Sequence, residues 1–289
     1  MKLVGGWFLT GQFEQMIDIG HGQPVVIVPG LQGRWEWKRD AVLALARSHR
    51  VIAYSLCDER ASGFACDPGH GFENYFQQLG AVLDRARLDR AAIVGVSYGG
   101  LIAVEFAARC PARVSSLVLA SALSLPWSPD ARARFYMRAP RLLFPAFVAA
   151  APFRMRREIK AALPGWREQA AFAWSSARRF LREPVSPSRM TRRLTWIQDH
   201  AFADHRAIQA PTLLMTGEPE LDRVVPVAVT RRYLSQIAGA RHVVLARTGH
   251  LGVLTQPDRF SEVITAFVTH GVTGAHTRHK DLDDLRHSA

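Results

Sequence analysis

One serine in the sequence stands in a setting that suits a nucleophile. Ser97 is the centre of the pentapeptide Gly-Val-Ser-Tyr-Gly at residues 95–99, between an apolar, β-branched run and a run with helical spacing. Gly95 and Gly99 allow a strand and a helix to pack closely around a very sharp turn, and such a turn exposes the serine Oγ. The N-terminus of the helix also places a positive dipole beside any negative charge that develops there. The spacing therefore predicts nucleophilic attack on a carbonyl carbon, although a Gly-rich structural turn can show the same pattern.

A serine nucleophile needs a histidine that accepts its proton, and His250 is the best candidate. For a nucleophile on a strand–turn–helix unit of this kind, the chain order is serine, acid, histidine. His250 follows the apolar run 242–245 and lies within Thr-Gly-His-Leu-Gly. His21 and His70 precede Ser97, which is the wrong order. Two histidines near the end of a helical region stay open as residues that line a substrate pocket, namely His200 and His205.

The acid that orients the histidine is predicted to be Asp222. It follows the apolar run 212–217 and begins the sequence Asp-Arg-Val-Val-Pro, which leads into a helical pattern. A carboxylate in this place holds the imidazole in one tautomer and stabilises its protonated form. Glu220 and Glu218 lie in the same loop and remain competitors. The acid of such a triad can also follow the preceding strand, but no acid directly follows the apolar run 114–120.

Two backbone N–H groups are expected to stabilise the negative oxygen of a tetrahedral intermediate. One belongs to Tyr98, directly after the nucleophile. The other belongs to Leu31, in the loop Pro-Gly-Leu-Gln-Gly at residues 29–33. Gly30 gives the backbone of this loop room to approach a ligand. An ordinary Gly-rich turn at this place is compatible with the same role.

The elements that must hold these residues alternate between strands and helices. Continuous apolar runs predict buried strands at residues 24–30, 51–56, 91–96, 114–120, 212–217 and 242–245. Helical spacing is found at residues 38–48, 73–88, 98–109, 227–237 and 258–267. Apolar strands that alternate with helices indicate a parallel sheet with helices on both faces.

The alternation stops between the fourth and fifth of these strands, where the chain is mainly helical and rich in Arg, Trp, Phe and Pro. Residues 126–205 are therefore expected to form a helical cap, or lid, inserted into an α/β core. The core comprises residues 1–125 and 206–273. The polar tail 274–289 is expected to be disordered.

The chain of 289 residues has a formal net charge of +12. Most of the excess positive charge lies in the cap region, where residues 126–200 contain 14 Arg and one Lys but only five acidic residues. This segment can be a solvated face, or it can attract an anionic substrate or an acidic membrane surface. No helix-turn-helix, zinc-finger or RNA-binding signature accompanies it, so no nucleic-acid partner is expected.

The remaining composition indicates a cytoplasmic protein without a resident metal. Cys57, Cys66 and Cys110 form neither an even set nor a metal-ligand spacing, so free thiols in a reducing compartment are expected. The Cys57-Asp58-Glu59 run matches no ligand pattern and is interpreted as a solvated loop. Neither a secretory signal nor an apolar run long enough to span a bilayer is found, so no stable membrane insertion is expected. No organic cofactor is implied, and the oligomeric state stays open.

Together these motifs resemble the α/β-hydrolase fold superfamily, in its members with a serine nucleophile and a lid. The resemblance runs from about residue 12 to residue 268. It rests on the loop 29–33, the pentapeptide around Ser97, the run that begins at Asp222, and Gly249-His250. It implies an eight-stranded, mostly parallel sheet, with up to two strands before the first apolar run, and a Ser–Asp–His triad. Haloalkane dehalogenases and epoxide hydrolases of this superfamily have Asp at the nucleophile position, so Ser97 argues against them.

Two loops depart from patterns that are common in the superfamily. Many members have His-Gly in the oxyanion loop, where this chain has Pro29-Gly30. Many also have Asp-x-x-Gly-x-Gly after the second strand, where this chain has the more charged run 57–63. Both departures leave the subfamily open.

The function expected from these residues is that of a serine hydrolase. It would cleave a carboxylic ester of a hydrophobic small molecule through an acyl-enzyme on Ser97. Lactones, thioesters, C–C bonds of diketone-like compounds and acyl transfer to another acceptor are alternatives, because the fold does not choose the bond. Outside enzymes, the alternatives are a non-catalytic ligand-binding protein and a basic module that binds nucleic acid or a membrane surface.

Overall fold

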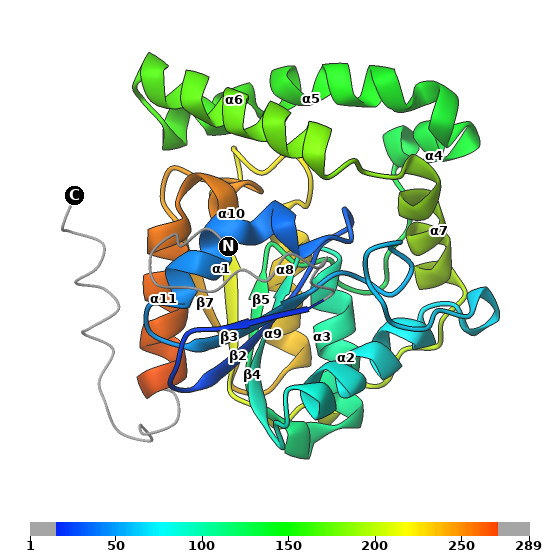
Figure 1. Ribbon diagram of the computed structural model, residues 1–289, viewed down its shortest axis with the longest axis vertical. Coiled ribbons are helices and arrows are strands. Elements are labelled where there is room, and N and C mark those ends of the chain that lie inside the picture. Colours follow the sequence, from blue (N-terminus) through cyan, green and yellow to red (C-terminus); the bar gives the residue numbers. More distant parts are fainter. Residues whose placement is uncertain (1–15, 271–289) are drawn as a thin grey trace, which may run out of the picture.

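A computed structural model describes residues 16–270 of the chain, and its centre is a seven-stranded sheet (Figure 1). The strand order is β1-β3-β2-β4-β5-β6-β7. β1 is antiparallel to β3, and every other neighbouring pair in the sheet is parallel. The strands are β1 (Met16–Ile19), β2 (Pro24–Val28), β3 (Arg50–Tyr54), β4 (Ala91–Val96), β5 (Val114–Ala120), β6 (Thr212–Thr216) and β7 (Arg241–Val244).

This architecture confirms the mostly parallel α/β sheet expected from the sequence. All six strands expected from apolar runs are present, from β2 to β7. β1 is one of the strands that the resemblance implies before the first apolar run, so residues 16–270 contain seven strands rather than eight. The second strand that the resemblance implies before the first apolar run, and the tail 274–289, lie outside the described residues.

Helices cover both faces of the sheet because its strands are apolar on both sides. On one face, Val42 and Ile264 belong to a buried cluster with the strands. On the other, Leu79, Phe106 and Tyr233 belong to a second cluster. The first face carries α1 (Arg39–Leu45), α10 (Gly252–Thr255) and α11 (Pro257–His270), and the second carries α2 (Glu73–Arg85), α3 (Gly99–Arg109) and α9 (Tyr233–Gln236).

The helix expected at residues 227–237 is divided into α8 (Val227–Arg231) and α9. Near the break, the Arg232 N–H donates to the Val229 carbonyl three residues back, so the turn is tighter than in an α-helix. Tyr233 follows the break, is fully buried, and donates its hydroxyl to the Leu123 carbonyl at 2.7 Å. This bond anchors the segment to the loop after β5.

Four helices form an insertion between β5 and β6, and Figure 1 shows it above the sheet. Their bounds are α4 (Ala131–Arg138), α5 (Pro140–Ala162), α6 (Trp166–Arg182) and α7 (Pro187–Gln198). Pro140 and Pro187 occupy first turns, where a missing N–H costs nothing. Asp130 and Ser186 cap α4 and α7. The insertion lies within the range 126–205 expected for the cap.

Candidate active site

The turn that carries Ser97 has the strained backbone expected of an exposed nucleophile. Ser97 follows β4 and precedes α3, and its φ of 55° lies in the left-handed region that side chains disfavour. Its N–H donates to the Ala120 carbonyl at 2.9 Å, and its carbonyl accepts from the Gly100 N–H at 3.0 Å. These bonds hold the turn against the end of β5, so the surrounding structure maintains the strain.

Two glycines make this turn sterically possible. A Cβ added to Gly95 would lie 2.7 Å from the Gly100 Cα. One added to Gly99 would lie 2.5 Å from the carbonyl oxygens of Val28 and Pro29. Because both distances are too short for a real Cβ, α3 approaches β4 and β2 more closely than any other residue type would permit. Only glycine therefore fits at these two positions of the pentapeptide.

The structure brings Asp222 and His250 together. Asp222 Oδ2 and His250 Nδ1 are 3.4 Å apart, and both side chains are largely buried. Asp222 Oδ1 accepts from the N–H groups of Val224 and Val225, each at 2.9 Å. Burial raises the pKa of Asp222, but the imidazole and the two N–H donors outweigh burial, and the net effect lowers this pKa. Asp222 is therefore ionised at neutral pH and can orient the imidazole.

Neither glutamate of the same loop takes this place. Glu218 accepts from the Arg247 N–H at 2.7 Å, and Glu220 is exposed to solvent. Among residues 16–270, Asp222 is the one carboxylate within ion-pair distance of His250. The geometry thus distinguishes among three acids that the sequence left as competitors.

The loops that carry Asp222 and His250 are packed against each other at a glycine. A Cβ added to Gly249 would lie 2.6 Å from the Leu221 carbonyl and 2.7 Å from the Asp222 nitrogen. Any side chain at this position would push the two loops apart. The glycine before His250 therefore controls the distance between the histidine and its acid.

Ser97 lies beside the loop after β2. A Cβ added to Gly30 would lie 3.5 Å from the Ser97 Cβ, so this loop passes close to the serine. No hydrogen bond joins the Ser97 Oγ to the His250 ring in the described part of the chain. Contacts between a nucleophile and its base are often long in free enzymes and shorten when substrate binds.

The two N–H groups predicted as oxyanion donors belong to the loops after β2 and β4. The loop 29–33 closes through the Gly33 N–H, which donates to the Gly30 carbonyl at 2.9 Å. Across residues 16–270, the N–H groups of Leu31 and Tyr98 donate to no protein acceptor. Both are therefore free to donate to a ligand oxygen.

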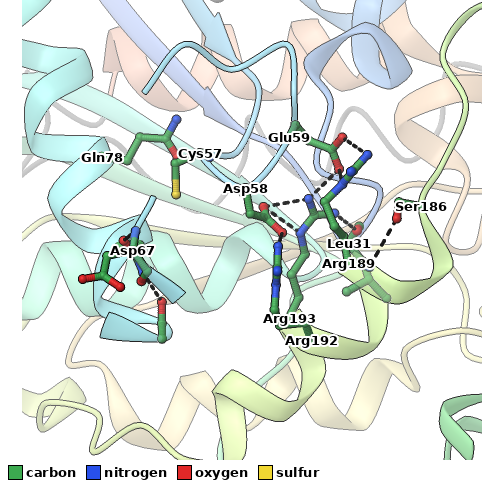
Figure 2. Close-up of polar contacts among 12 residues, drawn as sticks. Leu31, Cys57, Asp58, Glu59, Asp67, Gln78, Ser186, Arg189, Arg192 and Arg193 are labelled. Carbon is green, nitrogen blue, oxygen red and sulfur yellow. Dashed lines mark hydrogen bonds and ion pairs between the residues drawn. The ribbon is translucent and has the colours of Figure 1, made fainter. Parts of the chain in front are cut away.

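A buried arginine of the cap contacts both of these residues. The Arg193 Nη1 donates to the Leu31 carbonyl at 2.7 Å (Figure 2). The Arg193 carbonyl accepts from the Tyr98 hydroxyl at 3.2 Å. The guanidinium also lies against Gly33, where any Cβ would collide with it. Gly33 has a φ of 79°, so glycine is favoured there for two reasons. Helix α7 therefore supports the loop that carries one candidate oxyanion donor.

Two acids of the loop after β3 neutralise Arg193. Its Nη2 lies 2.7 Å from Asp58 Oδ1 and 2.6 Å from Glu59 Oε1, and the three side chains are 0–3% exposed. Arg189 and Arg192 add further ion pairs to the same acids (Figure 2). The expectation of a solvated loop at this place is thus wrong. The acids are buried because the arginines of α7 balance their charge, which sequence patterns do not show.

Glu158 of α5 makes a further contact with the His250 loop, which sequence reasoning missed. This side chain is fully buried, and its Oε1 accepts from the N–H groups of Gly249 and Leu251 at 2.8 and 2.5 Å. Its Oε2 has no hydrogen-bond partner in the described residues. Burial raises the pKa of Glu158 to about 7, although the two N–H donors and His250 act to lower it. The cap thus holds the backbone on both sides of the histidine.

The two histidines left open as pocket residues have partners elsewhere. His200 Nε2 is 3.2 Å from Glu105 Oε1, and its ring packs on Phe72 with centroids 5.0 Å apart. His205 Nδ1 is 3.0 Å from Gln236 Oε1. These contacts give both rings a structural role between the end of the cap and the core.

A hollow of about 640 Å³ is lined by Asp130, Ala131, Arg132, Arg154 and Arg223. Arg223 follows Asp222, and Arg154 precedes Glu158 by one helical turn. The Arg154 Nε is buried and has no hydrogen-bond partner in the described residues. Three arginines against one acid make this hollow suitable for an anionic group.

Among residues 16–270, no group of three or more His, Cys, Asp or Glu is arranged to hold a metal ion. The three cysteines are free. No helix in this range combines the length and the hydropathy that a bilayer-spanning segment needs.

Comparisons with known proteins agree with this fold. A model of the Alpha/beta hydrolase family matches residues 25–263. The 2-hydroxy-6-oxo-2,4-heptadienoate hydrolase of Pseudomonas putida is 28% identical over an alignment of 291 positions. The alignment covers 92% of this chain and 96% of that protein. RutD of Pantoea ananatis, whose name proposes carbamate hydrolysis, is 25% identical over 248 residues, which cover 84% and 86%. The solved structure of CumD, a meta-cleavage product hydrolase of Pseudomonas fluorescens, has a TM-score of 0.64 and 22% identity, and covers 89% of this chain and 94% of its own.

Proposed function

The chain belongs to the Alpha/beta hydrolase family, and we propose that it is a serine hydrolase with Ser97 as nucleophile, His250 as base and Asp222 as the orienting acid. The observation that carries the proposal is the pairing of His250 with Asp222 at 3.4 Å, in loops at the same edge of the sheet as the strained Ser97 turn. A pure binding protein has no need of all three residues.

In the proposed reaction, His250 accepts the Ser97 hydroxyl proton as Oγ attacks the carbonyl carbon. The carbonyl oxygen becomes negative and accepts hydrogen bonds from the N–H groups of Leu31 and Tyr98. The bond to the leaving group then breaks, and the leaving group takes the proton from His250. Water attacks the acyl group on Ser97, with His250 again as base, and releases an acid.

The bond that we propose is a C–C bond beside a ketone, in a dienoate such as 2-hydroxy-6-oxo-2,4-heptadienoate. The similarity to the Pseudomonas putida hydrolase spans nearly all of both chains and supports this bond over the carboxylic ester expected first. The arginine-lined hollow supports it too, because such a substrate carries a carboxylate. Hydrolysis would give acetate and 2-hydroxypenta-2,4-dienoate. Before cleavage the substrate must shift to its 2-oxo tautomer, in which the 2-hydroxyl has lost its proton and the carbon beside the 6-ketone has gained one. The electron pair of the broken C–C bond then moves onto the 2-oxo oxygen, which takes the proton from His250, and water supplies the new acetate oxygen.

We expect the protein to hydrolyse this dienoate with a kcat/KM of about 10⁴ M⁻¹s⁻¹ or more. The measurement is the loss of absorbance of the conjugated substrate, with acetate identified by NMR. A series of p-nitrophenyl esters of increasing chain length serves as the comparison. Efficient ester hydrolysis without dienoate cleavage would contradict the C–C proposal and restore the carboxylic ester as the substrate class.

We also propose that Glu158 positions the base. Replacing Glu158 with alanine leaves two buried N–H groups unpaired beside His250 and is expected to lower kcat by about 10²-fold, with little change in KM. Glutamine can still accept both hydrogen bonds and should retain most of the activity. Glu168→Gln is the matched control, because Glu168 lies on α6 and accepts from the Gly165 N–H at the cap surface. Equal rates for the alanine variant and wild type would contradict this role.

The same contact makes stability depend on pH. The pKa of Glu158 in the folded protein, about 7, is above its ordinary value of 4.5. Its contribution to the free energy of unfolding is therefore fully present below about pH 4.5 and is lost as the pH rises through about 7. Over this interval the wild type should lose stability relative to Glu158→Gln, as measured by urea unfolding. If the free energies of unfolding of the two proteins change in parallel with pH, the Glu158 carboxyl has an ordinary pKa.

A further inference from the structure

The outer part of the cap exposes large apolar side chains more than any other described region does. Leu142, Phe153, Trp166, Trp174 and Leu181 are 72–81% exposed, and we call these five residues the cap stripe. No other large apolar side chain in residues 16–270 exceeds 49%. Single exposed apolar residues are common on protein surfaces, but a group of this kind marks an interaction site.

The cap stripe faces away from the core. On α5, Leu142 and Phe153 are separated by close to three full helical turns, so they lie on the same side of the helix. Met155 and Glu158 are buried on the other side of α5. The three members on α6 are spaced by about two turns each, and α6 has no buried residue. Figure 1 shows α5 and α6 as the layer of the cap farthest from the sheet.

Uncompensated arginines accompany the cap stripe. Six exposed arginines of α5 and α6 form no ion pair within residues 16–270, namely Arg141, Arg156, Arg157, Arg167, Arg178 and Arg182. Glu168 is the one exposed acid on these two helices. The Arg167 guanidinium carbon lies 5.4 Å from the centroid of the Trp166 ring, so charged and apolar groups share one surface.

We propose that the cap stripe and these arginines form a peripheral docking surface for an anionic lipid bilayer. Helices that lie in a bilayer interface combine Trp, Phe and Leu with Arg, since the apolar groups enter the headgroup region and the cations bind lipid phosphates. A second copy of the chain is a poorer occupant, because a two-fold contact would bring the same positive surfaces together. The proposal is independent of the Ser97 chemistry.

The test measures cosedimentation of the full chain with vesicles of phosphatidylcholine alone and of phosphatidylcholine mixed with phosphatidylglycerol. We expect binding to the anionic vesicles and not to the neutral ones, with an affinity that falls as salt is added. Replacing Trp166 and Trp174 together with serine should weaken binding at least about tenfold. The Arg178→Gln, Arg182→Gln variant should weaken it as well. Leu234→Ser, which changes an exposed apolar residue of α9 outside the cap, should bind like wild type.

Several outcomes would overturn this proposal. These are no binding to anionic vesicles, equal binding by the wild type and the tryptophan variant, or a dimer in light scattering that the tryptophan variant loses. Ser97→Ala is expected to bind vesicles like wild type, and a loss of binding would mean that lipid is held at the active site instead. Circular dichroism checks that each variant is folded. Hydrolytic activity tests the role of Ser97, and cosedimentation with vesicles tests the role of the cap. Either proposal can therefore fail without the other.

Discussion

Replacing Ser97 with alanine is expected to abolish reaction with a fluorophosphonate probe and to lower hydrolytic turnover by about 10⁴-fold to 10⁶-fold. The alanine variant keeps the fold but lacks the oxygen that forms the covalent bond. Labelling is read as an increase in intact mass, and turnover is followed with the substrate that the wild type hydrolyses best. His250→Ala should lose labelling nearly as completely, because an unactivated serine is a weak nucleophile at neutral pH.

Ser121 provides the matched control for this experiment. It stands at the end of β5, the strand next to β4, is largely buried, and also has a positive φ, of 42°. Ser121→Ala therefore removes a serine from a similar backbone setting at the same sheet edge and should be labelled like wild type. If wild type itself is not labelled while circular dichroism shows a folded protein, the nucleophile proposal fails and the ligand-binding alternative takes its place.

Arg193→Met is expected to destabilise the protein by about 3–5 kcal/mol. The substitution keeps an apolar stem but leaves Asp58 and Glu59 buried without the charge that balances them. It also removes the hydrogen bond to the Leu31 carbonyl. The free energy of unfolding from urea titrations measures the effect, and the m-value checks that the denatured state is unchanged.

The neighbouring Arg192 is the control for Arg193. It forms an ion pair with the same Asp58, at 3.4 Å, but its side chain is 40% exposed. Exposed ion pairs contribute little, so Arg192→Met should cost less than about 1 kcal/mol. Combining Arg193→Met with Asp58→Asn and Glu59→Gln should recover part of the loss, because the uncompensated charges are then gone. Equal losses in the two single arginine variants would contradict this explanation.

The residues of the candidate triad could be found from sequence because each follows a strand that an apolar run predicts, although β7 proves to be a partly exposed edge strand. The apolar runs that become β4, β6 and β7 are continuous, and Ser97, Asp222 and His250 stand in the loops after them. In a parallel sheet these loops meet at one edge, so the strand pattern and the chain order together indicate which residues come close. The sequence favours Asp222 over Glu220 because Asp222 begins the run that leads into a helix, and the 3.4 Å distance from Asp222 to His250 supports that choice.

The contacts between the cap and the core could not be predicted in this way. Glu158 binds backbone 91 residues away, and Arg193 binds an acid 135 residues away. A basic helix with one glutamate has the same pattern whether that glutamate is buried or solvated. Asp58 and Glu59 likewise resemble solvated loop acids until α7 packs on them. The information lies in the pairing of distant segments, which local periodicity does not contain.

The cap is joined to the core at Glu158 and again at Arg193, and the helix between these two anchors is α6. It has no buried residue, and its contacts with its neighbours include the Arg179–Asp40 ion pair and the stacking of Phe180 on Phe144. Detaching α6 thus breaks no buried ion pair, whereas detaching α7 breaks several. Local opening free energies in proteins follow such differences in buried contacts. Movement of the cap is therefore expected to begin in α6, as partial unfolding of one helix rather than as the swing of a rigid lid.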